Sequence, residues 1–221
     1  MLVMRVVDDA SRRAALAKAA ELLRAGRLVA FPTETVYGLG ANALDETAVQ
    51  RIYDAKGRPA INPIIVHVAS TAAARDLALE WPIAADAVAR AFWPGPVTIV
   101  VRKRPIIPGI VSAGGETVGL RVPAHPLALA LLVQAGIPVA APSANLSTEV
   151  SPTSAQHVER GLGDRVDLII DGGPTNVGIE STVVDVTAGV PRILRPGMVA
   201  RDAIARAAGA AEAASALDGR E

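Results

Sequence analysis

Residues 28–42 read LVAFPTETVYGLGAN, and their pattern indicates the kind of fold. Residues 28–31 are a short, continuous apolar run, which is typical of a strand buried on both faces. Residues 32–42 hold two glycines, a proline and several polar side chains, so they predict a loop that follows this strand directly. The two threonine hydroxyls and the carboxylate in this loop could recognise a small polar molecule such as an amino acid.

Similar segments occur along the rest of the chain. Apolar residues spaced near 3.6 predict helices at 9–25, 46–55, 71–79, 84–92, 127–135 and 154–160. Apolar runs predict further strands at 64–68, 97–101, 118–122, 139–141, 167–171, 182–186 and 192–195. Because little helix separates the last three strands, part of the sheet should be antiparallel. We therefore predict an α/β domain over residues 1–208: a twisted, mixed parallel/antiparallel sheet with helices packed on it and a concave, loop-lined site. Residues 209–221 lack an apolar period and are predicted to form a flexible tail.

The composition argues against several classes of protein. Lys plus Arg and Asp plus Glu both number 22, so the formal net charge is zero, which counts against a general nucleic-acid coat protein. The absence of cysteine excludes disulfides and thiolate metal sites, and the three histidines lack zinc-ligand spacing. The longest uncharged stretch, 122–148, is broken by prolines and a glycine, so no membrane span is expected. No signal-peptide apolar region is present, and we expect a soluble, cytoplasmic protein.

Polar loops follow or precede several of the predicted strands. Six of them are rich in Gly, Pro, Ser, Thr or Arg: 32–42, 56–63, 94–96, 112–117, 142–152 and 172–181. Loops held by a rigid sheet commonly carry the binding groups of α/β proteins, so their convergence would make a site.

Two pairs of residues in these loops suit a phosphate. Lys56 and Arg58 flank Gly57, and cations beside a glycine that permits close backbone approach can bind a phosphate, although a solvated surface turn has the same pattern. Ser143 and Asn145 follow an apolar strand, where they could donate hydrogen bonds to a phosphate, ribose or carboxylate, or could cap a turn. There is no Walker loop for ATP and no G-x-S-x-G elbow for a serine nucleophile.

Three more side chains and one basic run have two interpretations each. His67 lies in an apolar strand, as a satisfied core residue or as a group facing a pocket. Arg121 lies on the apolar run 118–122, where a buried guanidinium needs an anionic partner and suits a bidentate carboxylate clamp. Arg195 could meet a phosphate or be exposed. The basic triplet 102–104 could protect a sheet edge or contact RNA.

Taken in order, several motifs resemble those of the YrdC/TsaC family of threonylcarbamoyl-AMP synthases. They are FPTETVYGLG at 31–40, KGR at 56–58 with SAN at 143–145, NP at 62–63, WPGPVT at 93–98, GLRVP at 119–123 and STVVD at 181–185. Each motif is moderately specific, and their ordered occurrence over residues 12–197 is highly specific. The resemblance implies the YrdC-like form of the predicted sheet, and a short form without the second domain that longer members carry.

The resemblance also implies an activity and a set of site residues. The family joins L-threonine, bicarbonate and ATP into L-threonylcarbamoyladenylate and pyrophosphate, for threonylcarbamoyl-adenosine modification of tRNAs that read ANN codons. Lys56 and Arg58 are implied as catalytic. Threonine contacts are implied at Thr35, His67, Arg121, Ala141 and Ser181. ATP contacts are implied at Lys56, Arg58, Asn62, Thr117, Ser143, Asn145, Ser151 and Arg195. Mg²⁺ is expected on the ATP phosphates without protein side-chain ligands. The expected partners are downstream threonylcarbamoyl-transferase proteins, with a possible tRNA contact.

The residues support a mechanism of positioning and charge neutralisation. A carbamate oxygen of the substrate would attack the α-phosphorus of ATP, with no covalent enzyme intermediate. No strong general base is evident, and His67 is only a candidate. The alternatives are a double-stranded RNA or tRNA-binding module without turnover, a carbamoyl transferase, and a degenerate regulatory paralogue. The carbamoyl transferases of hydrogenase maturation bear Cys-rich zinc segments, which this chain lacks, and the intact signature residues argue against a degenerate paralogue.

Overall fold

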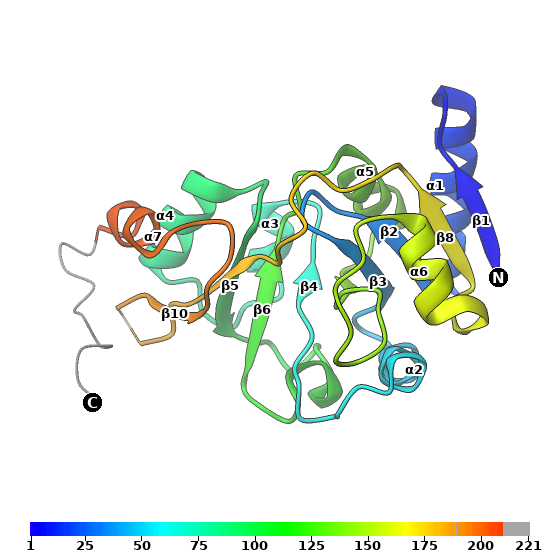
Figure 1. The fold of residues 1–221 in the computed structure, drawn as a ribbon. Helices are drawn as coiled ribbons and strands as arrows, with labels where there is room; N and C mark the ends of the chain where they lie inside the picture. The colour runs from blue at the N-terminus through cyan, green and yellow to red at the C-terminus, as the bar shows by residue number, and fades with distance from the viewer. Residues whose placement is uncertain (189, 210–221) are drawn as a thin grey trace.

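The computed structural model describes residues 1–188 and 190–209, which form a ten-stranded sheet flanked by helices (Figure 1). The strand order is β1-β8-β2-β3-β7-β4-β6-β5-β9-β10. The strands are β1 (Leu2–Arg5), β2 (Val29–Pro32), β3 (Tyr37–Asn42), β4 (Val66–His67), β5 (Val97–Arg102), β6 (Thr117–Arg121), β7 (Val139–Ala140), β8 (Leu168–Asp171), β9 (Thr182–Asp185) and β10 (Arg192–Arg195). The α-helices are α1 (Asp9–Arg24), α2 (Glu46–Lys56), α3 (Thr71–Arg75), α4 (Ile83–Phe92), α5 (Pro126–Ala135), α6 (Ala155–Leu162) and α7 (Arg201–Ala207). Two 3₁₀ turns are η1 (Gly109–Ser112) and η2 (Gly163–Arg165).

The sheet mixes parallel and antiparallel pairs, which confirms the predicted fold class. β8 lies parallel to both β1 and β2, β4 is parallel to β6, and β5 is parallel to β9. The antiparallel pairs are β2/β3, β3/β7, β4/β7, β5/β6 and β9/β10. Of the last three strands, only β9 and β10 pair antiparallel with each other, because β8 joins the opposite end of the sheet.

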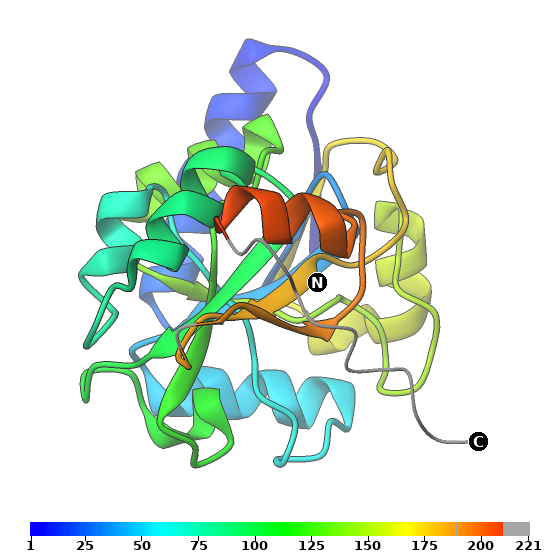
Figure 2. The ribbon, with the colours of Figure 1, turned by 90° about the vertical axis from the view of Figure 1, so that its left-hand side faces the viewer.

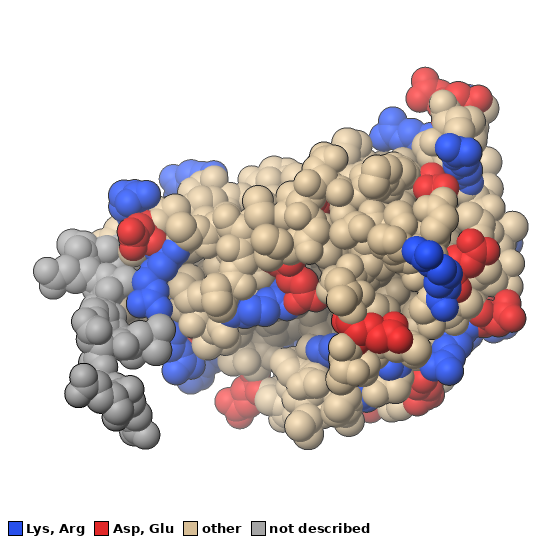
Figure 3. Space-filling model, in the orientation of Figure 1, with Lys and Arg blue, Asp and Glu red and all other residues tan. Residues whose placement is uncertain are grey.

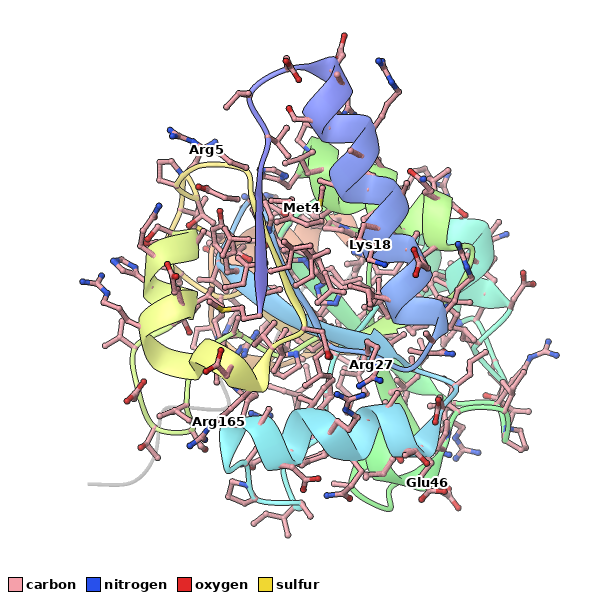
Figure 4. All side chains as sticks on the ribbon, turned by 90° about the vertical axis from the view of Figure 1, so that its right-hand side faces the viewer. Met4, Arg5, Lys18, Arg27, Glu46 and Arg165 are labelled. Atoms are coloured by element: carbon pink, nitrogen blue, oxygen red, sulfur yellow. The ribbon has the colours of Figure 1, made fainter. Side chains whose placement is uncertain are left out.

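Helices cover both faces of the sheet. On one face, Leu23 of α1 and Leu131 of α5 belong to a core with residues of β2 and β8. On the other face, Ile52 of α2 and Val158 of α6 belong to a larger core that also includes α4. Figure 4 shows α1 and α2 on opposite sides of the strands at the β1 edge. Successive residues of β2 belong to different cores, which confirms that this strand is buried on both faces.

Local signals account for the ends of the first helix. The side chain of Asp8 accepts a hydrogen bond from the Ser11 backbone N–H at 2.7 Å, and Ser11 Oγ accepts one from the Asp8 N–H at 3.0 Å. This reciprocal capping box satisfies two donors that the first helical turn leaves open. Gly26 then adopts a φ of +70°, which ends the helix as predicted.

The prediction of a loop over 32–42 is wrong in its second half. Residues 37–42 form the buried strand β3, paired in a hairpin with β2. Gly40 lies so close to its neighbours that an added Cβ would be 2.8 Å from side-chain atoms of both Phe31 and Val139. Its glycine therefore serves close packing between strands and not the turn that the sequence pattern indicated.

Other elements also differ from the predictions. β1 and α7 were not predicted, and β4 is confined to Val66–His67 within the expected 64–68 strand. Figure 2 shows α7 beside the β9/β10 end of the sheet. The predicted tail from 209 falls almost entirely outside the described residues, which end at 209. Within the described chain, no helix is both long and apolar enough to cross a membrane.

Candidate functional site

A partly open cavity of about 110 Å³ lies where several strands end. Loops 32–42, 56–63, 142–152 and 172–181 contribute to its wall, together with β4, β6 and β10. Four of the six predicted polar loops therefore converge on one site, whereas 94–96 and 112–117 do not line it. Figure 3 shows basic and acidic side chains next to one another around a hollow at the centre of the molecular face.

Most of the predicted site residues meet in this cavity. All five predicted threonine contacts line it: Thr35, His67, Arg121, Ala141 and Ser181. Of the predicted ATP contacts, Arg58, Ser143 and Arg195 line it as well. Lys56, Asn62, Thr117, Asn145 and Ser151 do not.

Arg121 lies at the base of the site and is only 4% exposed. Its Nη2 donates to Glu34 Oε1 at 2.7 Å and to Thr35 Oγ1 at 3.1 Å, and its Nε donates to the Gly95 carbonyl at 3.2 Å. Burial lowers the pKa of Arg121, and the Glu34 carboxylate counteracts this effect. The anionic partner expected for a buried arginine is thus a residue of the chain itself. Nη1 has no hydrogen-bond partner among the described residues and remains able to meet a ligand.

His67 is directly beside Arg121 in the sheet, because β4 and β6 pair these two residues in register. Burial, and then the positive charge of Arg121, lower the pKa of His67 to about 3, so its imidazole is neutral at ordinary pH. Its Nδ1 is buried and has no hydrogen-bond partner within the described structure. His67 lines the cavity, and a neutral imidazole can bond a hydroxyl or an N–H of a ligand.

Hydroxyl groups complete this end of the cavity. Thr35 Oγ1 lies 2.8 Å from Thr33 Oγ1, and Ser181 Oγ lies 2.8 Å from Thr98 Oγ1. Thr35 and Ser181 are both buried. The two hydroxyls are therefore held in place by neighbours before any ligand arrives, which lowers the entropy lost on binding.

Two further arginines, Arg58 and Arg195, also line the cavity. Arg58 Nε and Nη2 donate to the carbonyls of Asn62 and Pro63 at 3.2 and 3.0 Å, which fixes the guanidinium at the rim. Arg195 donates from Nη2 to the Ser181 carbonyl at 2.9 Å and forms an ion pair with Glu180 through Nη1. Two guanidinium groups at one end of a cavity suit an anion with several oxygens, such as a polyphosphate.

Lys56 has a different position from the one expected. It ends α2 and is 2% exposed, and its Nζ donates to the carbonyls of Ser143 and Asn145 and lies 3.4 Å from Asn145 Oδ1. Burial, and secondarily the charge of Arg58, lower the pKa of Lys56 to about 8. Lys56 therefore holds the loop that carries Ser143, and its direct contact with a phosphate stays a prediction.

Two of the remaining predicted ATP contacts, Asn62 and Ser151, bond residues that line the cavity, and the third does not. Asn62 offers its carbonyl to Arg58, and Ser151 Oγ donates to Glu180 Oε1 at 3.2 Å. Thr117 is exposed at the start of β6, opposite Arg102, and the structure does not bring it to the cavity.

Glu180, an acidic residue of the site, was not singled out from the sequence. It lines the cavity directly before Ser181, and its signal was a charge in the polar loop 172–181. Glu34, the carboxylate of loop 32–42 that was expected to recognise a small polar molecule, pairs with Arg121 instead of lining the cavity. No group of three or more His, Cys, Asp or Glu within the described ranges is placed to hold a metal ion.

Comparison with known proteins places this geometry in a family. The family model Sua5_yciO_yrdC, described as telomere recombination, matches residues 21–197. A threonylcarbamoyl-AMP synthase of Pyrococcus abyssi is 54% identical over 81% of this chain and 53% of its own length. A putative threonylcarbamoyl-AMP synthase of Mycobacterium tuberculosis is 40% identical over 91% of this chain and 93% of its own.

The solved structure of P. abyssi Sua5 complexed with L-threonine superposes with a TM-score of 0.87 at 48% identity, covering 93% of this chain and 60% of that one. E. coli YciO, at 24% identity and a TM-score of 0.81, covering 92% of this chain and 98% of that one, shares the fold. The chain spans little more than half the length of several curated relatives that it matches. With the family match extending over most of the chain, and with the predicted motif residues gathered in one cavity, the chain belongs to the Sua5/YciO/YrdC family.

Proposed function

We propose that the chain is an L-threonylcarbamoyladenylate synthase, which forms threonylcarbamoyl-AMP and pyrophosphate from L-threonine, bicarbonate and ATP. One observation carries the proposal: five predicted threonine contacts and three predicted ATP contacts lie in a single cavity. Membership in a family with relatives named threonylcarbamoyl-AMP synthase supports it. The L-threonine in the P. abyssi Sua5 complex supports the choice of amino acid.

The amino acid fits the end of the cavity around Arg121. The unpartnered Nη1 of Arg121 would take the threonine carboxylate, as a cation whose planar group matches a carboxylate. The imidazole of His67 and the hydroxyl of Thr35, which both line the cavity, would face the threonine hydroxyl. A valine would leave these buried polar groups without a partner, so the site should select strongly against it.

The triphosphate fits the end of the cavity around Arg58 and Arg195. The threonine nitrogen takes up carbon dioxide, derived from bicarbonate, and loses a proton to become a carbamate. A carbamate oxygen then forms a bond to the α-phosphorus while the bond to the β-phosphate oxygen breaks, and pyrophosphate leaves. The two guanidinium groups would neutralise charge on the phosphate oxygens, and Ser143 would donate to them. Positioning by these residues accounts for the reaction without a covalent enzyme intermediate.

Magnesium belongs to the same proposal. Mg²⁺ prefers phosphate oxygens and water to a dedicated protein cage, and it would neutralise phosphate charge when bound with ATP. The carboxylate of Glu180 is the only acidic group that lines the cavity within the described chain, so the phosphates would supply most of the ligands. The wider role, in cytoplasmic tRNA modification with downstream transferase proteins, is also part of this proposal.

Pyrophosphate release tests the function. The protein is assayed with ATP, Mg²⁺ and bicarbonate, and with L-threonine, L-serine or L-valine. We expect release to require both bicarbonate and threonine and to be poor with valine. Arg58→Ala should remove most of this turnover with the fold intact, as judged by its melting temperature. Release that does not depend on an amino acid, from folded protein, would contradict the proposal, and turnover near wild type in Arg58→Ala would contradict the role of that residue.

A further inference from the structure

The carboxylate of Glu180 contacts two of the residues expected to bind ATP. Its Oε2 forms an ion pair with Arg195 Nη1, and its Oε1 accepts a hydrogen bond from Ser151 Oγ at 3.2 Å. Burial lowers the pKa of Arg58 and of Lys56, and the nearby Glu180 carboxylate partly counteracts this effect on both groups. A single carboxylate thus lies where the predicted phosphate contacts converge.

Arg195 does not depend on this carboxylate for its position. Its Nε and Nη2 donate to the Ser181 carbonyl at 3.2 and 2.9 Å, and Nη2 lies 3.1 Å from Ser181 Oγ. Of the three guanidinium nitrogens, only Nη1 donates to Glu180. If the Glu180 side chain turned away, the guanidinium would keep its anchor on Ser181 and would present Nη1 to another anion.

The side chain of Glu180 can turn although its backbone cannot. A Cβ added to Gly197 would lie 2.5 Å from the Glu180 carbonyl oxygen and from the Thr182 nitrogen, so the backbone here is closely packed. The carboxylate, by contrast, is at the rim, where the side chain of Glu180 is 36% exposed. Its hydrogen-bond partners within the described residues are Arg195 and Ser151 alone. Rotation about side-chain bonds is therefore sufficient to clear the position.

We propose that the Glu180 carboxylate is a stand-in for a phosphate group of ATP, occupying the place between Arg195 and Ser151 until a phosphate displaces it. This inference rests on the proposed function and adds the location of one phosphate subsite to it. A carboxylate and a phosphate offer similar acceptor oxygens to a guanidinium, and two anions in contact there would repel each other. A phosphate that binds in this place has to break the Glu180–Arg195 pair first. ATP and pyrophosphate are consequently held less tightly than the arginines alone would hold them, which favours product release.

The substitution Glu180→Gln tests the proposal, because the proposal requires the variant to bind pyrophosphate more tightly than the wild type. Binding of inorganic pyrophosphate, without Mg²⁺ or threonine, is measured by titration calorimetry, and ATP is measured in the same way. A partly exposed ion pair is weak, so its loss should tighten pyrophosphate binding by about two- to fivefold. Threonine affinity should not change. Glu180→Ala should change the affinity in the same direction.

Glu149→Gln is the matched control, since it removes a nearby exposed carboxylate that, like Glu180, partly counteracts the effect of burial on the pKa of Lys56. Its pyrophosphate affinity should stay within twofold of wild type. Weaker or equal binding in Glu180→Gln would overturn the proposal, because Glu180 would then support the anion site or lie outside it. Equal tightening in both variants would also overturn it, since charge at a distance would suffice. Wild-type protein that binds neither anion and releases no pyrophosphate would instead remove the proposed function itself.

Discussion

The substitution Arg121→Met removes one partner of the buried Glu34–Arg121 ion pair. The two side chains are 15% and 5% exposed, and the second carboxylate oxygen of Glu34 has no hydrogen-bond partner among the residues that the structure describes. Breaking a buried pair costs about 3–5 kcal/mol, because the remaining charge is left uncompensated in a desolvated place. We expect the lower end, about 3 kcal/mol, since Glu34 retains some contact with water.

For a chain of this size, a loss of about 3 kcal/mol corresponds to a fall in melting temperature of roughly 6–12 °C. The free energy of unfolding is measured at neutral pH by urea denaturation with linear extrapolation. The double variant Arg121→Met/Glu34→Met should recover at least about 1 kcal/mol, because apolar side chains replace both charges. A single variant within 1 kcal/mol of wild type, or a double variant no more stable than the single, would refute the reasoning.

Two further predictions concern His67 and Lys56. The pKa of His67 is about 3 in the folded protein and near 6.5 when unfolded, so between these values the unfolded state binds more protons and stability falls as the pH is lowered. His67→Gln should lose this pH dependence, which reaches about 1.4 kcal/mol per pH unit in the wild type. Plots of melting temperature against pH that run parallel for the wild type and the variant down to pH 4.5 would contradict the prediction. Lys56→Met should cost about 2–3 kcal/mol and raise amide hydrogen exchange over residues 143–149 without ligand, since two loop carbonyls lose a charged donor. Unchanged exchange with lost turnover would indicate a direct phosphate contact instead.

The sequence predicted the α/β class and most elements because those elements follow local periodicity. It failed at β3, because the glycines of this strand are typical of loops. In the structure Gly40 packs closely against β2 and β7. It also missed β1, a four-residue edge strand whose side chains are mostly exposed although three of them are apolar. The partner of β1 is β8, far along the chain, so no local pattern records that pairing. β3 pairs with the neighbouring β2 and was missed because its glycines are typical of loops.

The site was predictable as a set of residues more than as a geometry. Motif order indicated the residues that line the cavity, but not their partners. The pairing of Arg121 with Glu34 joins residues 87 positions apart, and nothing around either one specifies the other. The same is true of Lys56, whose burial depends on the carbonyls of a loop nearly 90 positions later. Side-chain pairing across the fold is a tertiary property and had to come from the structure.

The shortness of β4 has a consequence for how recognition and assembly are linked. Two residues, Val66 and His67, join β7 on one side to β6 on the other. Successive side chains of a strand point to opposite faces, so a slip of one residue would present a valine to the cavity in place of the imidazole. His67 and Arg121, proposed to hold different ends of one small molecule, would then no longer be neighbours across the strands. A threonine that contacts both residues would therefore bind only to the sheet in its correct register. Its binding would stabilise the correctly folded sheet, in addition to supplying the substrate.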